Sequence, residues 1–113
     1  MDCIFCAIIN GDIPSTKVYE DDKCLAFRDI NPQAPVHIIV IPKKHIESLN
    51  DVNAENIDFV SHIFEVVPVI AKQENIADDG YRLISNCGEN AGQTVKHLHF
   101  HILAGKTLGE KIV

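Results

Sequence analysis

The chain has 113 residues, the length of one domain, because independent domains usually need roughly 100 to 200 residues. Its 16 acidic and 10 basic residues give a formal net charge of -6, which disfavours binding to a nucleic-acid backbone. No apolar run approaches the roughly 20 residues that cross a bilayer, and the start of the chain lacks a basic and then apolar leader. We therefore expect one domain, residues 1–113, in a reducing cytoplasm, with neither nucleic-acid nor membrane partners.

Local patterns predict a short helix and three strands in the first half of the chain. The apolar positions of residues 2–10 stop at Asn10-Gly11, as at the end of a helix. Two β-prone runs, residues 17–20 and 24–29, flank a polar turn and predict an antiparallel hairpin. After a loop with two prolines, residues 36–41 form an apolar strand that we expect to be central and buried on both faces.

The second half predicts one long helix and two more strands. Residues 53–74 carry apolar side chains at helical spacing, and Pro68 inside this helix should kink it near Phe64 or split it. His62 lies off the apolar stripe, so we expect it at the rim or in solvent. Strands are predicted at residues 81–86 and 97–103. The expected fold is therefore α+β, with an antiparallel sheet of about five strands, one long helix and a short N-terminal helix.

The four cysteines fall into two kinds. Cys24 and Cys87 lie in apolar segments and are predicted to be buried, inert thiols. Cys3 and Cys6 form a C-x2-C pair that could hold one tetrahedral metal, but a closed zinc site needs two further ligands. The alternative is that these two side chains pack the first helix.

Residues 97–103 read His-Leu-His-Phe-His-Ile-Leu and are the most informative stretch of the chain. Side chains alternate along a strand, so His97, His99 and His101 would share one face and the apolar residues the other. Three imidazoles on one face of a strand otherwise fit for burial are costly to desolvate when charged. This pattern therefore indicates function more than packing.

Two kinds of chemistry could use such a face. Neighbouring histidines of one face lie about 7 Å apart at Cα and could share an ion, but His97 and His101 would be about 13 Å apart, too far to join them readily. Alternatively, a neutral imidazole could attack phosphorus or an acyl carbon while an adjacent histidine stabilises charge. His99, with a histidine on each side, is the candidate nucleophile.

The loop before these histidines, residues 86–94, suggests the electrophile. It combines glycines with amide and hydroxyl donors at Asn86, Gln93 and Thr94, and could cradle an oxyanion. Glycine and asparagine also form ordinary turns, so the loop alone is weak support. Together with the histidines, it indicates a phosphorus-centred reaction on a small nucleotide-like anion.

Residues 97–103 match without exception the signature His-φ-His-φ-His-φ-φ of the histidine triad (HIT) family, in which φ is apolar. The chain also resembles the histidine triad nucleotide-binding (Hint) branch of that family, from Cys3 to about Gly105. This resemblance is carried by the segments Phe27-Arg28-Asp29-Ile30, Val40-Ile41-Pro42-Lys43-Lys44-His45 and Gly92-Gln93-Thr94-Val95.

The resemblance implies a HIT-like homodimer that hydrolyses the P–N bond of adenosine or guanosine 5′-monophosphoramidates. By this resemblance, His99 is the nucleophile that forms a nucleotidyl-histidine, His101 bonds the phosphate oxygens, and His37 orients the constellation. The implied substrate-binding residues are Ile4, Phe5, Ile8, Phe27 and Ile30 around the base, Asp29 at the ribose, and Asn86, Gly92, Gln93 and Thr94 at the phosphate and leaving group.

The resemblance also implies one structural zinc ion per chain. Some bacterial members of the family hold zinc with an N-terminal C-x2-C, the histidine of a Pro-Lys-x-His segment and the first triad histidine. The corresponding residues here are Cys3, Cys6, His45 and His97. A closed set of four ligands leaves no open position for water, so such a metal would be structural.

Several alternatives remain open at this point. Ile8 and Phe27 could be core residues, Asp29 could cap the turn at Asn31-Pro32, and His37 could be a satisfied core histidine. The chain could instead be a dinucleoside polyphosphate hydrolase or nucleotidyl transferase of a sister branch, a nucleotide-binding adaptor without catalysis, or a zinc module. Thr94 stands where serine is common and only a short segment follows the histidines, so substrate preference also stays open.

Overall fold

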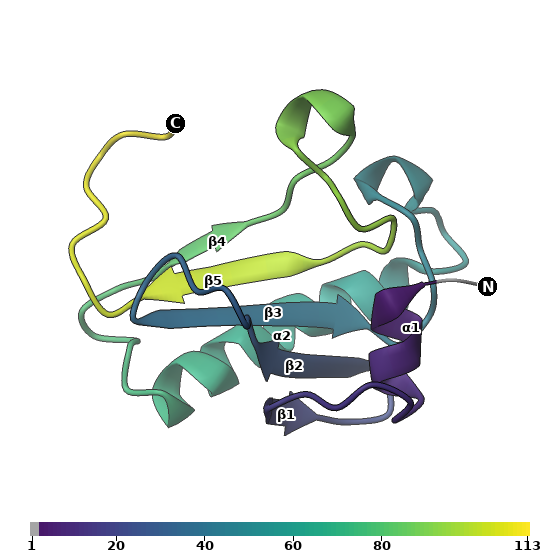
Figure 1. Ribbon diagram of the computed structural model, residues 1–113, viewed down its shortest axis with the longest axis horizontal. Coiled ribbons are helices and arrows are strands. Elements are labelled where there is room, and N and C mark those ends of the chain that lie inside the picture. Colours follow the sequence, from purple (N-terminus) through teal and green to yellow (C-terminus); the bar gives the residue numbers. More distant parts are fainter. Residues whose placement is uncertain (1–2) are drawn as a thin grey trace.

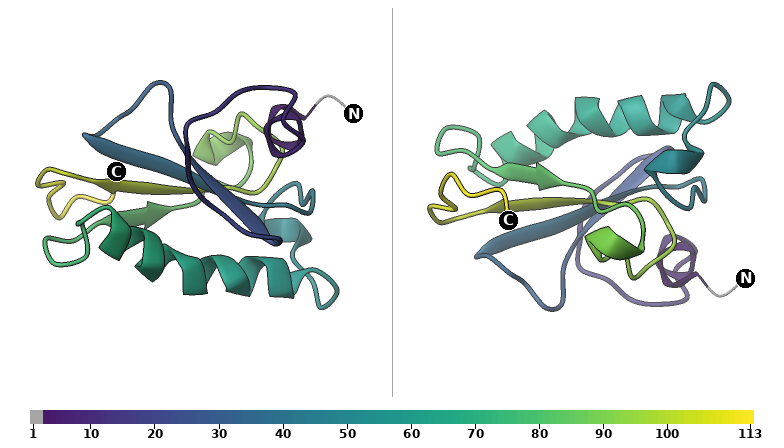
Figure 2. Two further views of the ribbon diagram at one scale, coloured as in Figure 1. Left: turned by 90° about the horizontal axis from the view of Figure 1, so that it is seen from below. Right: turned by 90° about the horizontal axis from the view of Figure 1, so that it is seen from above.

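The computed structural model describes residues 3–113, and in it a five-stranded antiparallel sheet carries a long helix on one face and a short helix on the other (Figures 1 and 2). This confirms the predicted α+β fold; Asp2, at the start of the predicted first helix, lies outside the described residues. The main elements are α1 (Ile4–Ile9), β1 (Lys17–Glu20), β2 (Cys24–Arg28), β3 (Val36–Pro42), α2 (Ile57–Gln73), β4 (Arg82–Ile84) and β5 (Phe100–Ala104). Two 3-10 turns, Leu49–Asp51 and Glu89–Ala91, lie in the loops.

The strands are ordered β1-β2-β3-β5-β4, so the predicted apolar strand β3 is central. It pairs with β2 on one side and with β5 on the other, where Ile39 lies opposite His101. The edge strand β4 pairs with β5 through Leu83 and Ile102. This order places β3 and β5, the strands that carry His37 and His101, next to each other in the sheet.

The two faces of the sheet belong to separate apolar clusters. Ile38 and Val40 of β3 face the cluster under α2, whereas Ile39 and Ile41 face a second cluster that α1 covers. The long helix continues through Pro68 without division. Of its predicted apolar stripe, Val60, Val67, Ile70 and Ala71 are buried, whereas Ile57 and Phe64 are 42% and 54% exposed, so the prediction was wrong for these two. The buried residues of α2 are Val60, Ile63, Val66, Val67, Ile70 and Ala71.

Helix α2 begins at Ile57, four residues later than predicted. Asn53 and Asn56 form a local turn ahead of it, in which the Asn53 side chain accepts from the amides of Glu55 and Asn56 at 2.9 and 3.2 Å. Asparagine side chains commonly form such turns in place of a helical start.

Strand β5 begins at Phe100, so the prediction of a strand from residue 97 was wrong at its start. The ladder with β3 ends at the pair of Val40 and Phe100, and Pro42, which lies two residues further along β3, has no N–H to continue it. Residues 97–99 therefore leave the ladder, and the Leu98 amide donates to the Ile46 carbonyl at 2.6 Å instead.

Among residues 3–113, no helix combines the length and the apolar character needed to cross a membrane.

Candidate active site

His37, His99 and His101 lie together on the sheet face opposite α2. His37 comes from β3, His101 from the adjacent strand β5, and His99 from the segment that has just left the ladder. His37 and His99 are each 6% exposed, and His97 is fully buried. Strand alternation predicted a shared face for His97, His99 and His101, and the rings of His99 and His101 lie 5.1 Å apart between centroids.

A short hydrogen bond determines which nitrogen of His99 is free. Its Nδ1 lies 2.7 Å from the carbonyl oxygen of His97, and because a carbonyl only accepts, Nδ1 carries the proton. The lone pair of Nε2 is then available to attack an electrophile. The Ser85 hydroxyl donates to the His99 carbonyl at 2.8 Å, and the Phe5 ring packs edge-on at 5.1 Å between centroids.

His37 and His101 form a chain with one direction of donation. The backbone N–H of Gln33 donates to Nδ1 of His37 at 3.0 Å, so the proton of His37 is on Nε2. That Nε2 lies 2.8 Å from Nδ1 of His101 and donates to it. Nε2 of His101 therefore carries a proton that can be donated to an anion.

Burial keeps this pair neutral. Burial and the nearby His99 and His37 lower the pKa of His101 to about 4. Burial also lowers the pKa of His37, and the carboxylate of Asp29 opposes that effect. Both imidazoles are therefore uncharged near pH 7 and act as hydrogen-bonding groups.

Asp29 bonds to its own turn and also lies beside His37. Its Oδ1 accepts from the Asn31 amide at 2.8 Å, which is the turn-capping bond considered as an alternative. Its Oδ2 lies 3.4 Å from Nε2 of His37. One carboxylate oxygen thus holds the loop while the other faces the histidines.

The polar residues of the loop before His97 bond largely to the loop itself. The Gln93 side chain accepts from the Gly88 amide at 2.9 Å and donates to the carbonyls of Glu47 and Val95 at 2.7 and 3.1 Å. The side-chain amide of Asn86 donates from Nδ2 to the Ala91 carbonyl at 2.9 Å. Gly92 adopts a φ of 80°, which favours glycine, and Thr94 is exposed.

The residues predicted around the base divide into buried and exposed ones. Phe5, Ile8 and Phe27 belong to the apolar cluster under α1, with the rings of Phe5 and Phe27 5.7 Å apart. These three thus pack as core residues, the alternative considered for Ile8 and Phe27. Ile4 and Ile30 are 48% and 91% exposed, so they are available to a ligand.

Four residues far apart in sequence form a compact set of metal-ligating atoms. The donor atoms of Cys3, Cys6, His45 and His97 all lie within 4.8 Å of one another. The Cys3 sulfur lies 3.3 Å and the Cys6 sulfur 3.6 Å from Nδ1 of His97. Nδ1 of His45 lies 3.2 Å from Nδ1 of His97. A tetrahedral zinc ion requires about 3.3 Å between two nitrogen ligands and about 3.6 Å between nitrogen and sulfur.

The protonation of the four residues also fits a cation. His97 donates from Nε2 to the Pro42 carbonyl at 2.9 Å, which leaves Nδ1 unprotonated toward the sulfurs. Burial lowers the pKa of His97 to about 4, whereas burial and Cys3 raise the pKa of Cys6 to about 11. A bound cation would therefore be needed to keep the Cys6 sulfur as a thiolate at neutral pH.

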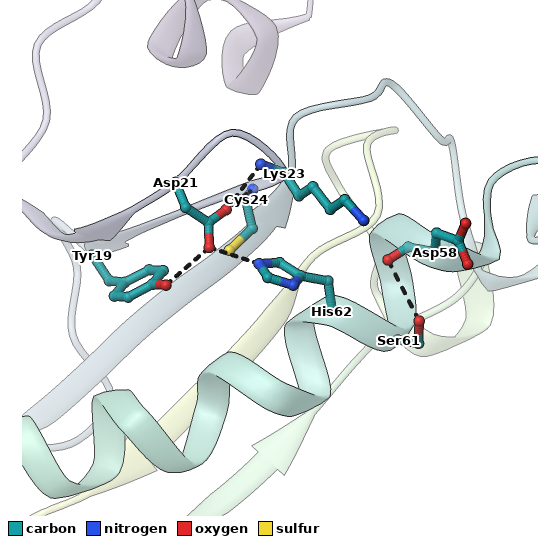
Figure 3. A network of polar contacts seen from close by, with 7 residues as sticks. All are labelled: Tyr19, Asp21, Lys23, Cys24, Asp58, Ser61 and His62. Carbon is teal, nitrogen blue, oxygen red and sulfur yellow. Dashed lines mark hydrogen bonds and ion pairs between the residues drawn. The ribbon is translucent and has the colours of Figure 1, made fainter.

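Two other groups in the described part of the chain fail the same test. Asp21, Cys24 and His62 lie close together, but His62 Nε2 and Asp21 Oδ2 are 2.6 Å apart, which is a hydrogen bond (Figure 3). The pair of His37 and His101, at 2.8 Å, is likewise too close for two zinc ligands. His62 is half-buried at the rim, as predicted, and its pairing with Asp21 was not predicted.

The remaining cysteines differ from each other. Cys24 is fully buried as predicted, and burial and Asp21 raise its pKa to about 12. Cys87 is only half-buried, so the prediction that it is buried was wrong; it lies in the loop before the 3-10 turn Glu89–Ala91, outside the sheet.

Comparison with known proteins gives a consistent assignment. The family profile described as "Scavenger mRNA decapping enzyme C-term binding" matches residues 2–112. The purine nucleoside phosphoramidase of Escherichia coli K12 is 51% identical over 106 residues, which cover 94% of this chain and 89% of that protein.

Solved structures agree in fold. A histidine triad protein from Clostridium difficile is 59% identical with a TM-score of 0.94, and the match covers 98% of this chain and 96% of that one. A HIT family hydrolase from Clostridium thermocellum is 47% identical with a TM-score of 0.96, covering 99% and 97%. From its histidine arrangement, its fold and these relatives, the chain belongs to the histidine triad family.

Proposed function

We propose that this protein is a purine nucleoside phosphoramidase of the Hint type, a hydrolase of the P–N bond in adenosine or guanosine 5′-monophosphoramidates. The observation that carries the proposal is the 2.7 Å hydrogen bond from His99 Nδ1 to the His97 carbonyl, which leaves Nε2 free. The purine nucleoside phosphoramidase of Escherichia coli, 51% identical, supports this substrate class.

The reaction has two displacements at the α-phosphorus. In the first, the Nε2 lone pair of His99 forms a bond to phosphorus, and the P–N bond breaks with its electron pair on the amine, which takes a proton from solvent. In the second, water attacks the same phosphorus and loses a proton, and the bond to Nε2 breaks. The nucleoside monophosphate and neutral His99 are regenerated.

The other histidines stabilise the transferring group. His101 donates from Nε2 to a phosphate oxygen, because its Nδ1 already accepts from His37 at 2.8 Å. His37 is the residue that orients His101, and the Gln33 amide sets its tautomer. Asp29 and exposed Ile4 and Ile30 are the proposed contacts to ribose and base, beside Phe5, Ile8 and Phe27. The proposed phosphate and leaving-group contacts are Asn86, Gly92, Gln93 and Thr94.

The test is hydrolysis of adenosine 5′-phosphoramidate by the wild-type protein and by His99→Ala. We expect kcat to fall at least about a thousandfold in the variant while AMP binding is retained. Mass spectrometry of the wild-type reaction, quenched rapidly in alkaline denaturant because a phosphorus–imidazole bond is labile in acid, should detect an AMP adduct on His99. Faster cleavage of a dinucleoside polyphosphate would favour the sister-branch enzyme, and tight AMP binding without turnover would favour an adaptor.

We also propose that the cluster of Cys3, Cys6, His45 and His97 holds one zinc ion per chain. The two thiolates and two neutral imidazoles are ligands that structural zinc sites use, and their spacing supports tetrahedral coordination. Such an ion supplies a fixed link between the N-terminal helix and the strands, and takes no part in bond breaking.

A homodimer is proposed from the solvent side of α2. Ile57, Ser61, Phe64 and Pro68 lie at helical spacing, are all exposed and carry no charge. The Phe64 ring is 54% exposed although it packs 5.5 Å from Phe100. This uncharged stripe is the surface that we propose a second copy of the chain covers, and β4 is an edge strand open to pairing.

A cytoplasmic location and a single catalytic domain, residues 1–113, complete the proposal. None of Cys3, Cys6, Cys24 and Cys87 forms a disulfide in the described residues, as expected in a reducing compartment.

A further inference from the structure

Helix α1 lies between the metal cluster and the proposed nucleotide site. It has six residues, Ile4–Ile9, with Cys3 as its N-cap, and a helix of this length is not stable on its own. Two attachments hold it: Phe5 and Ile8 pack into the apolar cluster, and Cys3 and Cys6 belong to the metal-ligating set.

The same helix presents groups to the nucleophile and to the proposed base site. The Phe5 ring lies edge-on to the rings of both His97 and His99, with centroids 5.8 and 5.1 Å away. Ile4, 48% exposed, lines a cavity of about 480 Å³. Other residues around this cavity are Cys3, His45, Thr94 and Val95. Metal ligands and proposed substrate contacts therefore alternate along one short helix.

A second connection runs through His97. Its Nδ1 faces the sulfurs of Cys3 and Cys6, its Nε2 donates to the Pro42 carbonyl, and its own carbonyl accepts from Nδ1 of His99. His97 is thus in contact with the proposed metal ligands, with Pro42 and with His99. The bond that leaves Nε2 of His99 free depends on that placement, because the accepting carbonyl belongs to a metal ligand.

We propose that Cys3, Cys6 and His45 are positioning residues for the nucleotide site: zinc held by them fixes α1 and the His97 carbonyl, so zinc and purine nucleotide bind cooperatively. This inference rests on the proposed function and on the proposed zinc. Without the ion, four donor atoms that lie within 4.8 Å of one another lose their common partner. Helix α1 would then keep only its apolar attachment.

Coupling between two binding sites is reciprocal, so it can be measured from either side. We expect zinc-loaded wild-type protein to bind AMP at least about tenfold more tightly than chelator-treated protein, by calorimetry. Conversely, saturating AMP should tighten zinc by the same factor in competition with a chromophoric chelator. The ¹⁵N NMR signal of His99 Nδ1–H should shift or broaden when zinc is removed.

Variants separate positioning from general loss of structure. His45→Ala should lose the zinc effect on AMP affinity, whereas His45→Cys should retain it, because Nδ1 coordination places the metal close to the backbone, within reach of a sulfur. Cys87→Ser, a thiol outside the cluster, should behave as wild type. Far-UV circular dichroism and urea unfolding of each zinc-free form check that the sheet and α2 stay folded.

Equal AMP affinity with and without zinc, in protein that stays folded and keeps the same His99 signal, would overturn the coupling. A failure of AMP to bind either form would instead contradict the proposed function, and the His99 signal would then decide whether zinc positions the imidazole. Unfolding of the zinc-free protein as a whole would also overturn the inference, since the ion would then support the entire fold.

Discussion

The Asp21 carboxylate should contribute more to the free energy of unfolding than any other carboxylate of the β1–β2 hairpin. Oδ1 of Asp21 accepts from the amides of Lys23 and Cys24, both at 2.9 Å, and Oδ2 accepts from the Tyr19 hydroxyl at 2.9 Å and pairs with His62 at 2.6 Å (Figure 3). These bonds join the β1–β2 turn to α2. The side chains of Asp21 and His62 are only 22% and 25% exposed.

Removal of this carboxylate breaks four bonds to an ionised acceptor. Such bonds contribute about 1 to 3 kcal/mol each and are not additive, so we expect Asp21→Ala to lower the free energy of unfolding by about 3 kcal/mol. Asp21→Asn keeps an oxygen for the backbone amides and should cost about 1 to 2 kcal/mol. Asp22→Ala, at an exposed position next to it, is the matched control and should change stability by less than about 0.5 kcal/mol.

Urea unfolding followed by circular dichroism, at one protein concentration because a dimer would be concentration-dependent, measures these differences. Burial raises the pKa of Asp21, but the bonds from His62, Lys23, Tyr19 and Cys24 outweigh it and lower the pKa. The stabilisation is thus present above the ordinary carboxyl range and is lost as pH falls below about 4. Equal stabilities of Asp21→Ala and Asp22→Ala, or an unchanged acid slope in Asp21→Asn, would refute this reasoning.

Three further predictions use other parts of the fold. Gly105→Ala should destabilise by about 2 kcal/mol more than Gly109→Ala, because both have positive φ but only at Gly105 would Cβ lie 2.8 Å from Pro35; equal urea midpoints would contradict this. The pKa of His101 is lowered to about 4, so its stabilisation is full above the ordinary histidine value of about 6.5 and is lost toward pH 4; His101→Asn should flatten that slope in urea unfolding. Phe64→Glu should yield monomers by sedimentation velocity, whereas Glu65→Gln should not; an intact dimer would exclude this face.

Much of the fold could be predicted from local periodicity. The 3.6-residue spacing of α2 and the unbroken apolar run of β3 are both reproduced, because each is decided by which side chains must be buried. The alternation of residues 97–103 correctly separated the histidines from the apolar face. The strand boundary failed because it depends on the partner strand, where Pro42 ends the ladder.

Other features of the site carry no local signal. The pairing of His62 with Asp21 joins residues 41 positions apart, and no pattern in either segment predicts it. The hydrogen bond from His99 to His97 requires a backbone bend that strand periodicity does not include. The four residues proposed to hold zinc were grouped by resemblance to a family, since C-x2-C alone identifies only half of such a site.

The division of the sheet into two faces has a consequence for how this protein can change over time. Within β3, the side chains of His37, Ile39 and Ile41 lie on the face of the proposed active site, while Ile38 and Val40 between them belong to the core under α2. Substitutions that repack the α2 side can therefore accumulate, or be engineered for heat resistance, while the face of the proposed active site is inherited unchanged. Stability and substrate choice become separately selectable traits that meet only in the backbone of one strand.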